Sequence, residues 1–307
     1  DSLFSSCALL ESITISSSIT SIGIDAFENC EKLKNITLKE GLTTIKERAF
    51  EGCTALETIT IPSTVTSIDY GIFMNCPKLS NIEVASDNTA FCVEDNVLYD
   101  FTKTRLVSAP SASGVFTIPS TVTTIDEYAF YSSAITSLTI PDSVTCIKES
   151  AFTACTSLTS VTLPKNLKTL EANTFLGCKA LETVSIPEGL ETIKECAFYD
   201  CNKLNNLTIP SSIKTIGDRS FSSCIGLTNI TIEEGVTKIE DGAFYNCNKL
   251  VTITLPSTIT SLGNYIFTDC SDLTTINFNG TQSQWDAITK DYSLWQGNTT
   301  AKVTILK

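Results

Sequence analysis

The sequence predicts an α/β repeat solenoid, in which short units of one strand and one helical segment stack into a single elongated core. Three observations support this fold class. Phenylalanine recurs every 23 residues along most of the chain, cysteine follows most of these phenylalanines by three residues, and an apolar–polar alternation that ends at proline recurs at a fixed phase. Repetition at a period of roughly 20 to 50 residues is typical of solenoids.

The phenylalanine column is interrupted once. Its members are Phe4, Phe27, Phe50 and Phe73, and then Phe130, Phe152, Phe175, Phe198, Phe221, Phe244 and Phe267. The step from Phe130 to Phe152 is 22 residues, which indicates a deletion of one residue. Because stacked units present the same position to one another, this column predicts a continuous aromatic core.

The unit at residues 45–68 shows how each element is predicted. Apolar residues recur four apart, which is the spacing of one helix face, at Ile45, Ala49 and Cys53. Ile59 and Ile61 flank a threonine, and this alternation predicts a strand with one buried face. Pro62 ends the strand because proline has no N–H group to donate to a ladder. Each unit is therefore expected to form a short helical segment and a short strand.

Ten of the 13 cysteines form a second column. They are Cys7, Cys30, Cys53, Cys76, Cys155, Cys178, Cys201, Cys224, Cys247 and Cys270. A core column predicts small buried side chains. Neighbouring Cα atoms would be within disulfide reach, but their Cβ vectors would run parallel, so we expect reduced thiols. The other three, Cys92, Cys146 and Cys196, form no C-x-x-C motif, and no metal site is expected.

The polar positions of the strands form two uncharged columns. One contains Thr14, Thr37, Thr60, Glu83, Thr139, Thr162, Ser185, Thr208, Thr231, Thr254 and Asn277. The other contains Ser12, Asn35, Thr58, Asn81, Ser137, Ser160, Thr183, Asn206, Asn229, Thr252 and Thr275. Cross-strand threonine pairs stabilise sheets, which gives these columns a structural explanation. The alternative is a surface of regularly spaced hydroxyl groups for a glycan or an extended peptide.

The repeat A-F-x-x-C-x-x-L-x-x-I-x-I-P, seen at residues 49–62, resembles the BspA-like leucine-rich repeats over nearly the whole chain. The resemblance implies a right-handed arc with a parallel β-sheet on its concave face and short helical segments on its convex face. Proteins of this family are mostly surface or secreted proteins of bacteria and some parasitic protists, and several are adhesins or host-binding proteins. It implies an extracellular, non-catalytic protein without a cofactor, whose partner is a host or matrix protein or a glycan.

The chain divides into four predicted segments. Residues 1–82 and 116–276 are leucine-rich repeats, residues 83–115 are an irregular insertion or elongated repeat, and residues 277–307 are a C-terminal cap. The chain begins in mid-unit, so further repeats or a cap are expected before Asp1. In the cap, residues 282–289 predict a helix that buries Trp285, residues 301–306 predict a final strand, and the second tryptophan is Trp295. We expect a monomer.

The insertion predicts three strands. Residues 91–100 predict two strands joined by a turn at Asp95 and Asn96, and residues 106–110 predict a third. The segment resembles the D-G-V-L-Y insertion of many BspA-like proteins, with Asn96 in place of glycine. It is either an elongated repeat that keeps the core continuous or a hairpin displayed for binding.

Candidate ligand-binding residues are aromatic or basic side chains, since these dominate protein interfaces. The insertion contributes Phe91, Tyr99, Phe101 and Arg105, and the flanks of the phenylalanine column contribute Tyr128, Tyr131, Tyr199 and Tyr245.

Composition excludes several classes of function. A net charge of −13 argues against nucleic acid and anionic membranes, and the absence of histidine removes Ser-His-Asp and Cys-His catalysis. No apolar run approaches the roughly 20 residues that span a bilayer. The interpretations that remain are a binding module, a structural spacer within a larger surface protein and, third, a repeat-fold polysaccharide-active enzyme. The enzyme needs clustered carboxylates, and the polar columns contain only Glu83.

Overall fold

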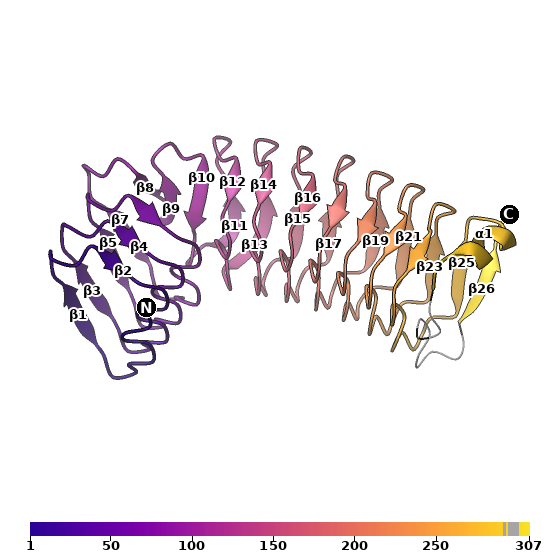
Figure 1. Ribbon diagram of the computed structural model, residues 1–307, viewed down its shortest axis with the longest axis horizontal. Coiled ribbons are helices and arrows are strands. Elements are labelled where there is room, and N and C mark those ends of the chain that lie inside the picture. The colour runs from indigo at the N-terminus through magenta and orange to yellow at the C-terminus, as the bar shows by residue number, and fades with distance from the viewer. Residues whose placement is uncertain (291–292, 294–300) are drawn as a thin grey trace.

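The computed structural model describes residues 1–290, 293 and 301–307. Figure 1 shows the chain wound into coils that stack side by side along an arc, with the N-terminus in the first coil and the C-terminus at the other end. A regular coil contains a long strand, a strand of two residues and a segment of turns. The predicted solenoid is confirmed as a parallel β-solenoid, whereas the handedness of the arc and the concave position of its sheet stay predictions.

The long strands form one side of the stack, which we name the long-strand face. They are β1 (Ser12–Ile15), β3 (Asn35–Leu38), β5 (Thr58–Ile61), β7 (Asn81–Val84), β11 (Ser113–Thr117), β13 (Ala134–Thr139), β15 (Ser160–Thr162), β17 (Thr183–Ser185), β19 (Asn206–Ile209), β21 (Asn229–Ile232), β23 (Thr252–Leu255), β25 (Thr275–Phe278) and β26 (Lys302–Ile305).

The two-residue strands form a second side, the short-strand face. They are β2 (Ser21–Ile22), β4 (Thr44–Ile45), β6 (Ser67–Ile68), β12 (Thr124–Ile125), β14 (Cys146–Ile147), β16 (Thr169–Leu170), β18 (Thr192–Ile193), β20 (Thr215–Ile216), β22 (Lys238–Ile239) and β24 (Ser261–Leu262). The insertion adds β8 (Phe91–Glu94), β9 (Val97–Asp100) and β10 (Arg105–Ser108), and the single helix among the described residues is α1 (Gln282–Ala287).

The sheets follow the repeat. The long strands form the sheets β1-β3-β5-β7, β11-β13-β15-β17 and β19-β21-β23-β25-β26. Paired strands are parallel, and a residue aligns with the residue one repeat later in the chain, as Thr14 does with Thr37 and Thr208 with Thr231. Only β8, β9 and β10 pair antiparallel among the described strands.

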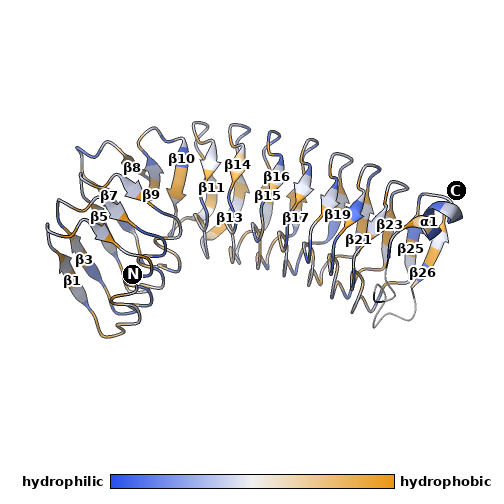
Figure 2. Ribbon diagram, in the orientation of Figure 1, coloured by the Kyte–Doolittle hydropathy of each residue, from blue (hydrophilic) through white to orange (hydrophobic). Residues whose placement is uncertain are grey.

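The phenylalanine column forms the predicted aromatic core. Neighbouring rings stack with centroids 5.0 to 6.1 Å apart and planes within 22° of parallel, first over Phe4 to Phe73 and then over Phe130 to Phe267. Figure 2 shows apolar residues recurring in every coil along the stack. At the interruption, Phe116 meets Phe130 edge-on at 5.3 Å instead.

The prediction of helical segments on the convex side is wrong. In residues 45–53 a short strand is followed by consecutive turns, with Arg48 at φ 53° and Gly52 at φ 68°. The backbone N–H groups of Arg48, Phe50 and Gly52 donate to carbonyls of the next coil. A helix would need these groups for its own i to i−4 bonds, so bonding between coils excludes it. Consecutive turns with i to i−3 bonds, such as Glu51 N–H to Arg48 O and Cys53 N–H to Phe50 O, bury apolar residues at a spacing close to that of a helix.

The cysteine column has a bonding role that its spacing did not indicate. Each of nine buried thiols lies 3.1 to 3.3 Å from the carbonyl oxygen of the column phenylalanine one coil earlier, as Cys53 Sγ does with Phe27 O. Burial raises the pKa of the Cys53 thiol to about 12, so this thiol keeps its proton and donates it. Cys7, in the first coil, is exposed.

The insertion lies within the stack and does not project from it as a separate hairpin. Its three predicted strands are confirmed as β8, β9 and β10, and β10 pairs with β12 of the following coil. Neighbouring residues of β9 and β10 pack in different hydrophobic cores. Leu98 and Val107 pack with the N-terminal coils, whereas Tyr99 and Leu106 pack with the coils that follow the insertion. The inserted sheet is therefore a wall between two cores, and Figure 1 shows the stack changing direction there.

The C-terminal elements close the last coil. The predicted helix is α1, whose Thr281 and Gln284 form a capping box, and Trp285 packs against Phe278 with ring centroids 5.3 Å apart. The predicted final strand is β26, which pairs with β25. Trp295 lies outside the described residues, and the division of the chain into four segments stays a prediction. No helix in the described ranges is long and apolar enough to cross a bilayer.

Candidate functional site

The long-strand face carries the two predicted polar columns. The strand registers align Ser137 with Ser160 and Thr183, and Thr208 with Thr231 and Thr254. Successive strands are about 4.8 Å apart, so hydroxyl and amide groups repeat at that interval. Their apolar neighbours point into the core, because adjacent residues of a strand face opposite sides of the sheet.

Some of these polar groups bond to one another. Thr60 Oγ1 donates to Glu83 Oε2 at 3.1 Å, and Asn81 Nδ2 donates to Glu83 Oε1 at 3.1 Å. Ser137 and Ser160 share a hydrogen bond at 3.4 Å. These contacts support the structural explanation of the columns, while the exposed remainder of each side chain stays available to a ligand.

The long-strand face is interrupted between β7 and β11, which belong to different sheets. The side chain of Asn96 bonds to the backbone at the open edge of β7 and just before it. Its Oδ1 accepts from the N–H of Ile82 at 2.6 Å, and its Nδ2 donates to the carbonyl of Leu79 at 3.0 Å and to Ser111 Oγ at 2.6 Å. In the sequence, Asn96 is visible only as a departure from glycine, because its bonding partners are 14 to 17 residues away and follow no repeat spacing.

A hollow of about 430 Å³, which we name the β11 hollow, opens beside the interruption. One side is formed by β11, where Val115 is 80 % exposed, and the other by Glu94, at the end of β8, and by Asp95 of the β8–β9 turn. Glu94 forms an ion pair with Lys103 at 2.9 Å. The hollow therefore combines an exposed strand, an apolar side chain and a carboxylate rim.

A second hollow of about 490 Å³ lies where β17 and β19 belong to different sheets. It is lined mainly by amide and charged side chains, from Glu182, Asn202, Lys203, Asn205, Asn206 and Lys249. Thr228 Oγ1 donates to Asn205 Oδ1 at 3.0 Å and to Asn206 Oδ1 at 3.3 Å. The amide nitrogens of this hollow suit an oxygen-rich ligand.

Two predicted ligand-binding residues of the insertion are core residues. Phe91 is 4 % exposed and Tyr99 is 2 % exposed, so neither presents a binding surface, although Tyr99 forms part of the wall of the β11 hollow. Burial raises the pKa of Tyr99 to about 12. The prediction failed for them because strands of the insertion are buried on both faces. Phe101, just after β9, is 56 % exposed and remains a candidate.

Arg105 has a structural position. Its Nε lies 2.5 Å from a carboxylate oxygen of Asp126, which is fully buried, and its guanidinium also donates to the carbonyl of Ile68 at 3.1 Å. Arg105 therefore ties β6 to β12 across the interruption. Lys148 Nζ lies 2.8 Å from the other oxygen of Asp126, so two cations flank this one buried carboxylate.

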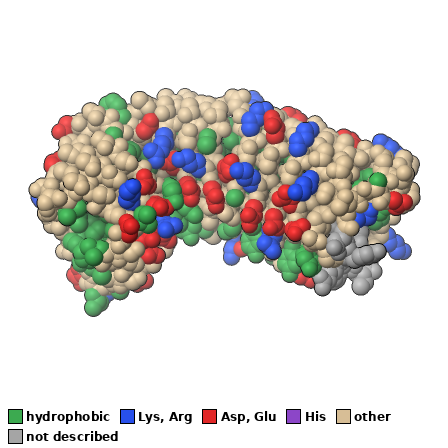
Figure 3. Space-filling view, in the orientation of Figure 1, with side chains coloured by type: hydrophobic (Ala, Val, Ile, Leu, Met, Phe, Trp, Pro, Cys, Tyr) green, Lys and Arg blue, Asp and Glu red, His purple; other side chains and the backbone are tan. Residues whose placement is uncertain are grey.

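This ion pair belongs to a column that sequence analysis missed. The residue after the short strand is charged in seven of the ten described coils that have one, at Lys46, Asp69, Asp126, Lys148, Glu171, Lys194 and Glu240. Opposite charges are neighbours from Lys46 to Asp69 and along Asp126, Lys148, Glu171 and Lys194. Lys194 and Glu171 are 2.5 Å apart, and Lys46 and Asp69 are 4.0 Å apart. Figure 3 shows acidic and basic side chains in rows along the stack. Charged residues at the repeat period, with opposite signs on neighbouring coils in two runs, were the signal that could have revealed this column.

The structure brings two predicted tyrosines together on the side of the stack that is formed by the turns after the short strands, which we name the turn side. The rings of Tyr128 and Tyr131 are 6.0 Å apart, and Tyr70, from the other side of the interruption, is 6.3 Å from Tyr128. Burial raises the pKa of Tyr128 and of neighbouring Glu127. Tyr199 is half-buried and Tyr245 is 36 % exposed, and each lies in a different coil from this cluster.

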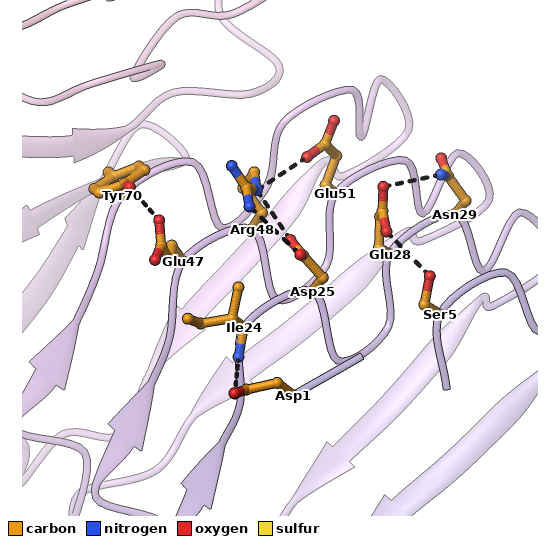
Figure 4. A network of polar contacts seen from close by, with 10 residues as sticks. All are labelled: Asp1, Ser5, Ile24, Asp25, Glu28, Asn29, Glu47, Arg48, Glu51 and Tyr70. Atoms are coloured by element: carbon orange, nitrogen blue, oxygen red, sulfur yellow. Dashed lines mark hydrogen bonds and ion pairs between the residues drawn. The ribbon is translucent and has the colours of Figure 1, made fainter. Parts of the chain in front are cut away.

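Polar contacts between coils occupy much of the turn side near this cluster (Figure 4). The hydroxyl of Tyr70 donates to Glu47, which raises the Tyr70 pKa to about 12. Arg48 Nε lies 2.9 Å from Asp25 and 3.8 Å from Glu51. These groups hold successive coils together. Among the described residues, no three Cys, Asp or Glu side chains gather in a way that could hold a metal ion.

Comparison with protein families identifies the repeat. Residues 1–113, 113–205 and 191–304 match the family described as BspA type leucine rich repeat region, with six copies. No curated protein matches the sequence.

Solved structures show the same fold. A leucine rich cell surface protein from Faecalibacterium prausnitzii is 30 % identical, with a TM-score of 0.60 over 96 % of this chain and 66 % of that one. A leucine-rich repeat protein from Eubacterium ventriosum is 25 % identical, with a TM-score of 0.67 over 100 % of this chain and 80 % of that one. The pneumococcal vaccine antigen PcpA, at 20 % identity and a TM-score of 0.64, shares the fold over 97 % of this chain and 68 % of its own.

Proposed function

The chain belongs to the BspA-type leucine-rich-repeat family, and from that premise we propose that it is a non-catalytic binding module of a bacterial surface or secreted protein. Its partner is a host or matrix protein, or a glycan, and the module acts as a monomer. The name of the Faecalibacterium relative, a cell surface protein, supports the location. That relative is longer than this chain, which spans 66 % of its length.

The observation that carries the proposal is the long-strand face. A rigid sheet presents hydroxyl and amide groups in register on strand after strand, and hollows of about 430 and 490 Å³ open where the sheet is interrupted. Pockets of roughly 300 to 1,000 Å³ are typical of ligand sites. Regular polar spacing with little charge suits a repeating ligand, such as a glycan, or an extended chain.

The test is a binding screen of the 307-residue chain against glycans and extracellular-matrix proteins at physiological salt. A double variant, Thr208→Lys with Thr231→Lys, places two cations on neighbouring long strands. The matched control, Thr192→Lys with Thr215→Lys, places them on neighbouring short strands. We expect saturable binding that the first variant weakens at least about tenfold, or about 1.4 kcal/mol, and the control leaves unchanged.

Two results would contradict the proposal: no saturable ligand on the panel, or equal losses in both double variants. The first would favour a structural spacer. A specific observation supports that second candidate, because stacked phenylalanines, thiol–carbonyl bonds and alternating ion pairs connect successive coils on several sides. Such a rod would hold another domain away from the cell without binding a ligand itself.

A further inference from the structure

We propose that the free edge of β11 binds an extended, basic peptide segment of the partner protein, which pairs with β11 as an added strand and places a lysine or arginine against Asp95. The inference rests on the proposed function and names the chemistry of its partner. Four features of the β11 hollow carry it.

The first feature is the open edge. β11 is the terminal strand of its sheet and pairs only with β13 among the described strands. A terminal strand leaves alternate N–H and C=O groups without partners in the sheet, and an extended peptide can pair with them. On the opposing side of the same interruption, Asn96 already occupies the N–H of Ile82 in β7 and the carbonyl of Leu79 just before that strand.

The second feature is Val115. The register aligns Val115 with Ser137, and the same column continues through Ser160 and Thr183. An apolar side chain therefore replaces a hydroxyl residue at the one strand of this sheet that borders the hollow, and it is 80 % exposed. A β-branched apolar residue on an added strand would cover it, because same-face neighbours on paired strands contact each other.

The third feature is the shape of the site. The exposed residues of β11 form one wall of the β11 hollow, and the β8–β9 turn forms the other. The turn is anchored by Asn96, whose side chain bonds to β7 and to Ser111. The site is therefore a preformed slot beside a strand edge, and binding does not have to order the slot first.

The fourth feature is charge. Asp95 is exposed and forms no direct ion pair among the described residues. The nearby Lys103 pairs directly with Glu94 at 2.9 Å and interacts with Asp95 only at longer range. With a chain net charge of −13, the slot attracts a basic segment and repels an acidic one. The same charge disfavours a second copy of this chain as the occupant.

The experiment uses the 307-residue chain and three blocked decapeptides of alternating threonine and valine, with lysine, glutamine or glutamate at both ends. Binding is measured by titration, and the site is located by hydrogen exchange. We expect the lysine peptide to bind at least tenfold more tightly than the glutamate peptide, with the difference shrinking as salt rises. It should also slow amide exchange in residues 113–117.

Variants separate the features. Asp95→Asn should remove most of the lysine preference, and Val115→Thr should weaken all three peptides at least threefold. The matched controls are Asp269→Asn, at another aspartate of positive φ, and Val251→Thr, at another exposed valine; both should bind as the parent chain does. These substitutions are at exposed positions, so the variants should fold.

Three outcomes would overturn the inference: unchanged exchange in residues 113–117, equal binding of the lysine and glutamate peptides, or a dimer in sedimentation that protects residues 113–117 without peptide. The last would make a second copy the occupant. A host ligand whose binding is unaffected by Asp95→Asn and Val115→Thr would sink this inference while the proposed function stands. If the lysine peptide binds but the screen finds no host ligand, this inference stands and the proposed function is contradicted.

Discussion

At the scale of single residues, the cysteine column couples neighbouring coils. A buried thiol donates to the carbonyl of the phenylalanine one coil earlier, as Cys224 does with Phe198 at 3.2 Å. The coil with a deleted residue has Ser133 at this place, and its hydroxyl lies 3.3 Å from Cys155 Sγ. Cysteine in this column is therefore both a small core residue and a hydrogen-bond donor, a role that alanine could not fill.

These thiols predict that stability falls at high pH. Burial raises the pKa of Cys53, Cys224 and Cys270 from about 9 to about 12. Between these values the unfolded chain releases protons that the folded chain keeps. The stabilisation is complete below pH 9 and is lost as pH rises toward 12, at up to about 1.4 kcal/mol per pH unit for each thiol. Urea unfolding at pH 8 to 10.5 under reducing conditions measures the slope.

The matched variants for this prediction are Cys224→Ala and Cys146→Ala. Loss of the buried donor should cost about 1–3 kcal/mol at pH 8 and should also make the decline above pH 9 shallower by one thiol. Cys146 is exposed and outside the column, so its substitution should change the free energy of unfolding by less than about 0.5 kcal/mol. A pH slope unchanged by Cys224→Ala would contradict the assignment.

At the scale of the elements, the β8–β9 turn completes the edge of β7. Both turn residues have positive φ, with Asp95 at 50° and Asn96 at 59°. Asparagine tolerates this conformation, and its side-chain amide can bond to backbone N–H and C=O groups that have no neighbouring strand. The family pattern has glycine at this position, which would supply the conformation without the hydrogen bonds.

Substitution of Asn96 separates conformation from bonding. Asn96→Gly should destabilise the chain by about 1–3 kcal/mol, because the N–H of Ile82 and the carbonyl of Leu79 lose their partner. Asn96→Ala should cost about 1 kcal/mol more, since alanine also strains at positive φ. Thermal unfolding measures both changes, with Asp95→Gly as the control. Equal stability of Asn96→Gly and the parent chain would show that the amide contributes nothing.

At the scale of the whole molecule, the insertion joins two cores. Adjacent residues of β10 serve different ones, since Leu106 packs with the C-terminal core and Val107 with the N-terminal core. Arg105 and Asp126 add an ion pair across the same junction. The two parts of the solenoid therefore share one wall and can still differ in stability, as repeat arrays do.

Substitutions at these neighbouring positions should weaken different parts of the chain. Leu106→Ala, which removes a large buried side chain at a cost of about 2–5 kcal/mol, should speed amide exchange mainly in residues 116–276. Val107→Ala should speed exchange mainly in residues 1–82. Hydrogen exchange resolved by segment measures both, and each variant serves as the control for the other. Uniform acceleration along the chain in both variants would mean that the stack opens as one cooperative unit.

Much of the architecture could be predicted from local pattern. The 23-residue period specified the stack, the alternation before each proline specified the long strands, and the insertion showed its three strands and turn. These features follow from residues close in sequence, where apolar periodicity directly reports the buried face. The polar columns were predictable for the same reason, because the period sets the register.

Contacts between coils decided the rest. Residues 45–53 have helical spacing, yet they form turns because the neighbouring coil takes their N–H groups. Phe91 and Tyr99 had the composition of interface residues, yet two cores bury them; Arg105 is held by Asp126, 21 residues away in the chain. Sequence by itself determined which residues repeat and which face the core. Only the tertiary structure decided which groups stay free, because each coil's backbone and charged groups are satisfied by the next coil, beyond the reach of local pattern.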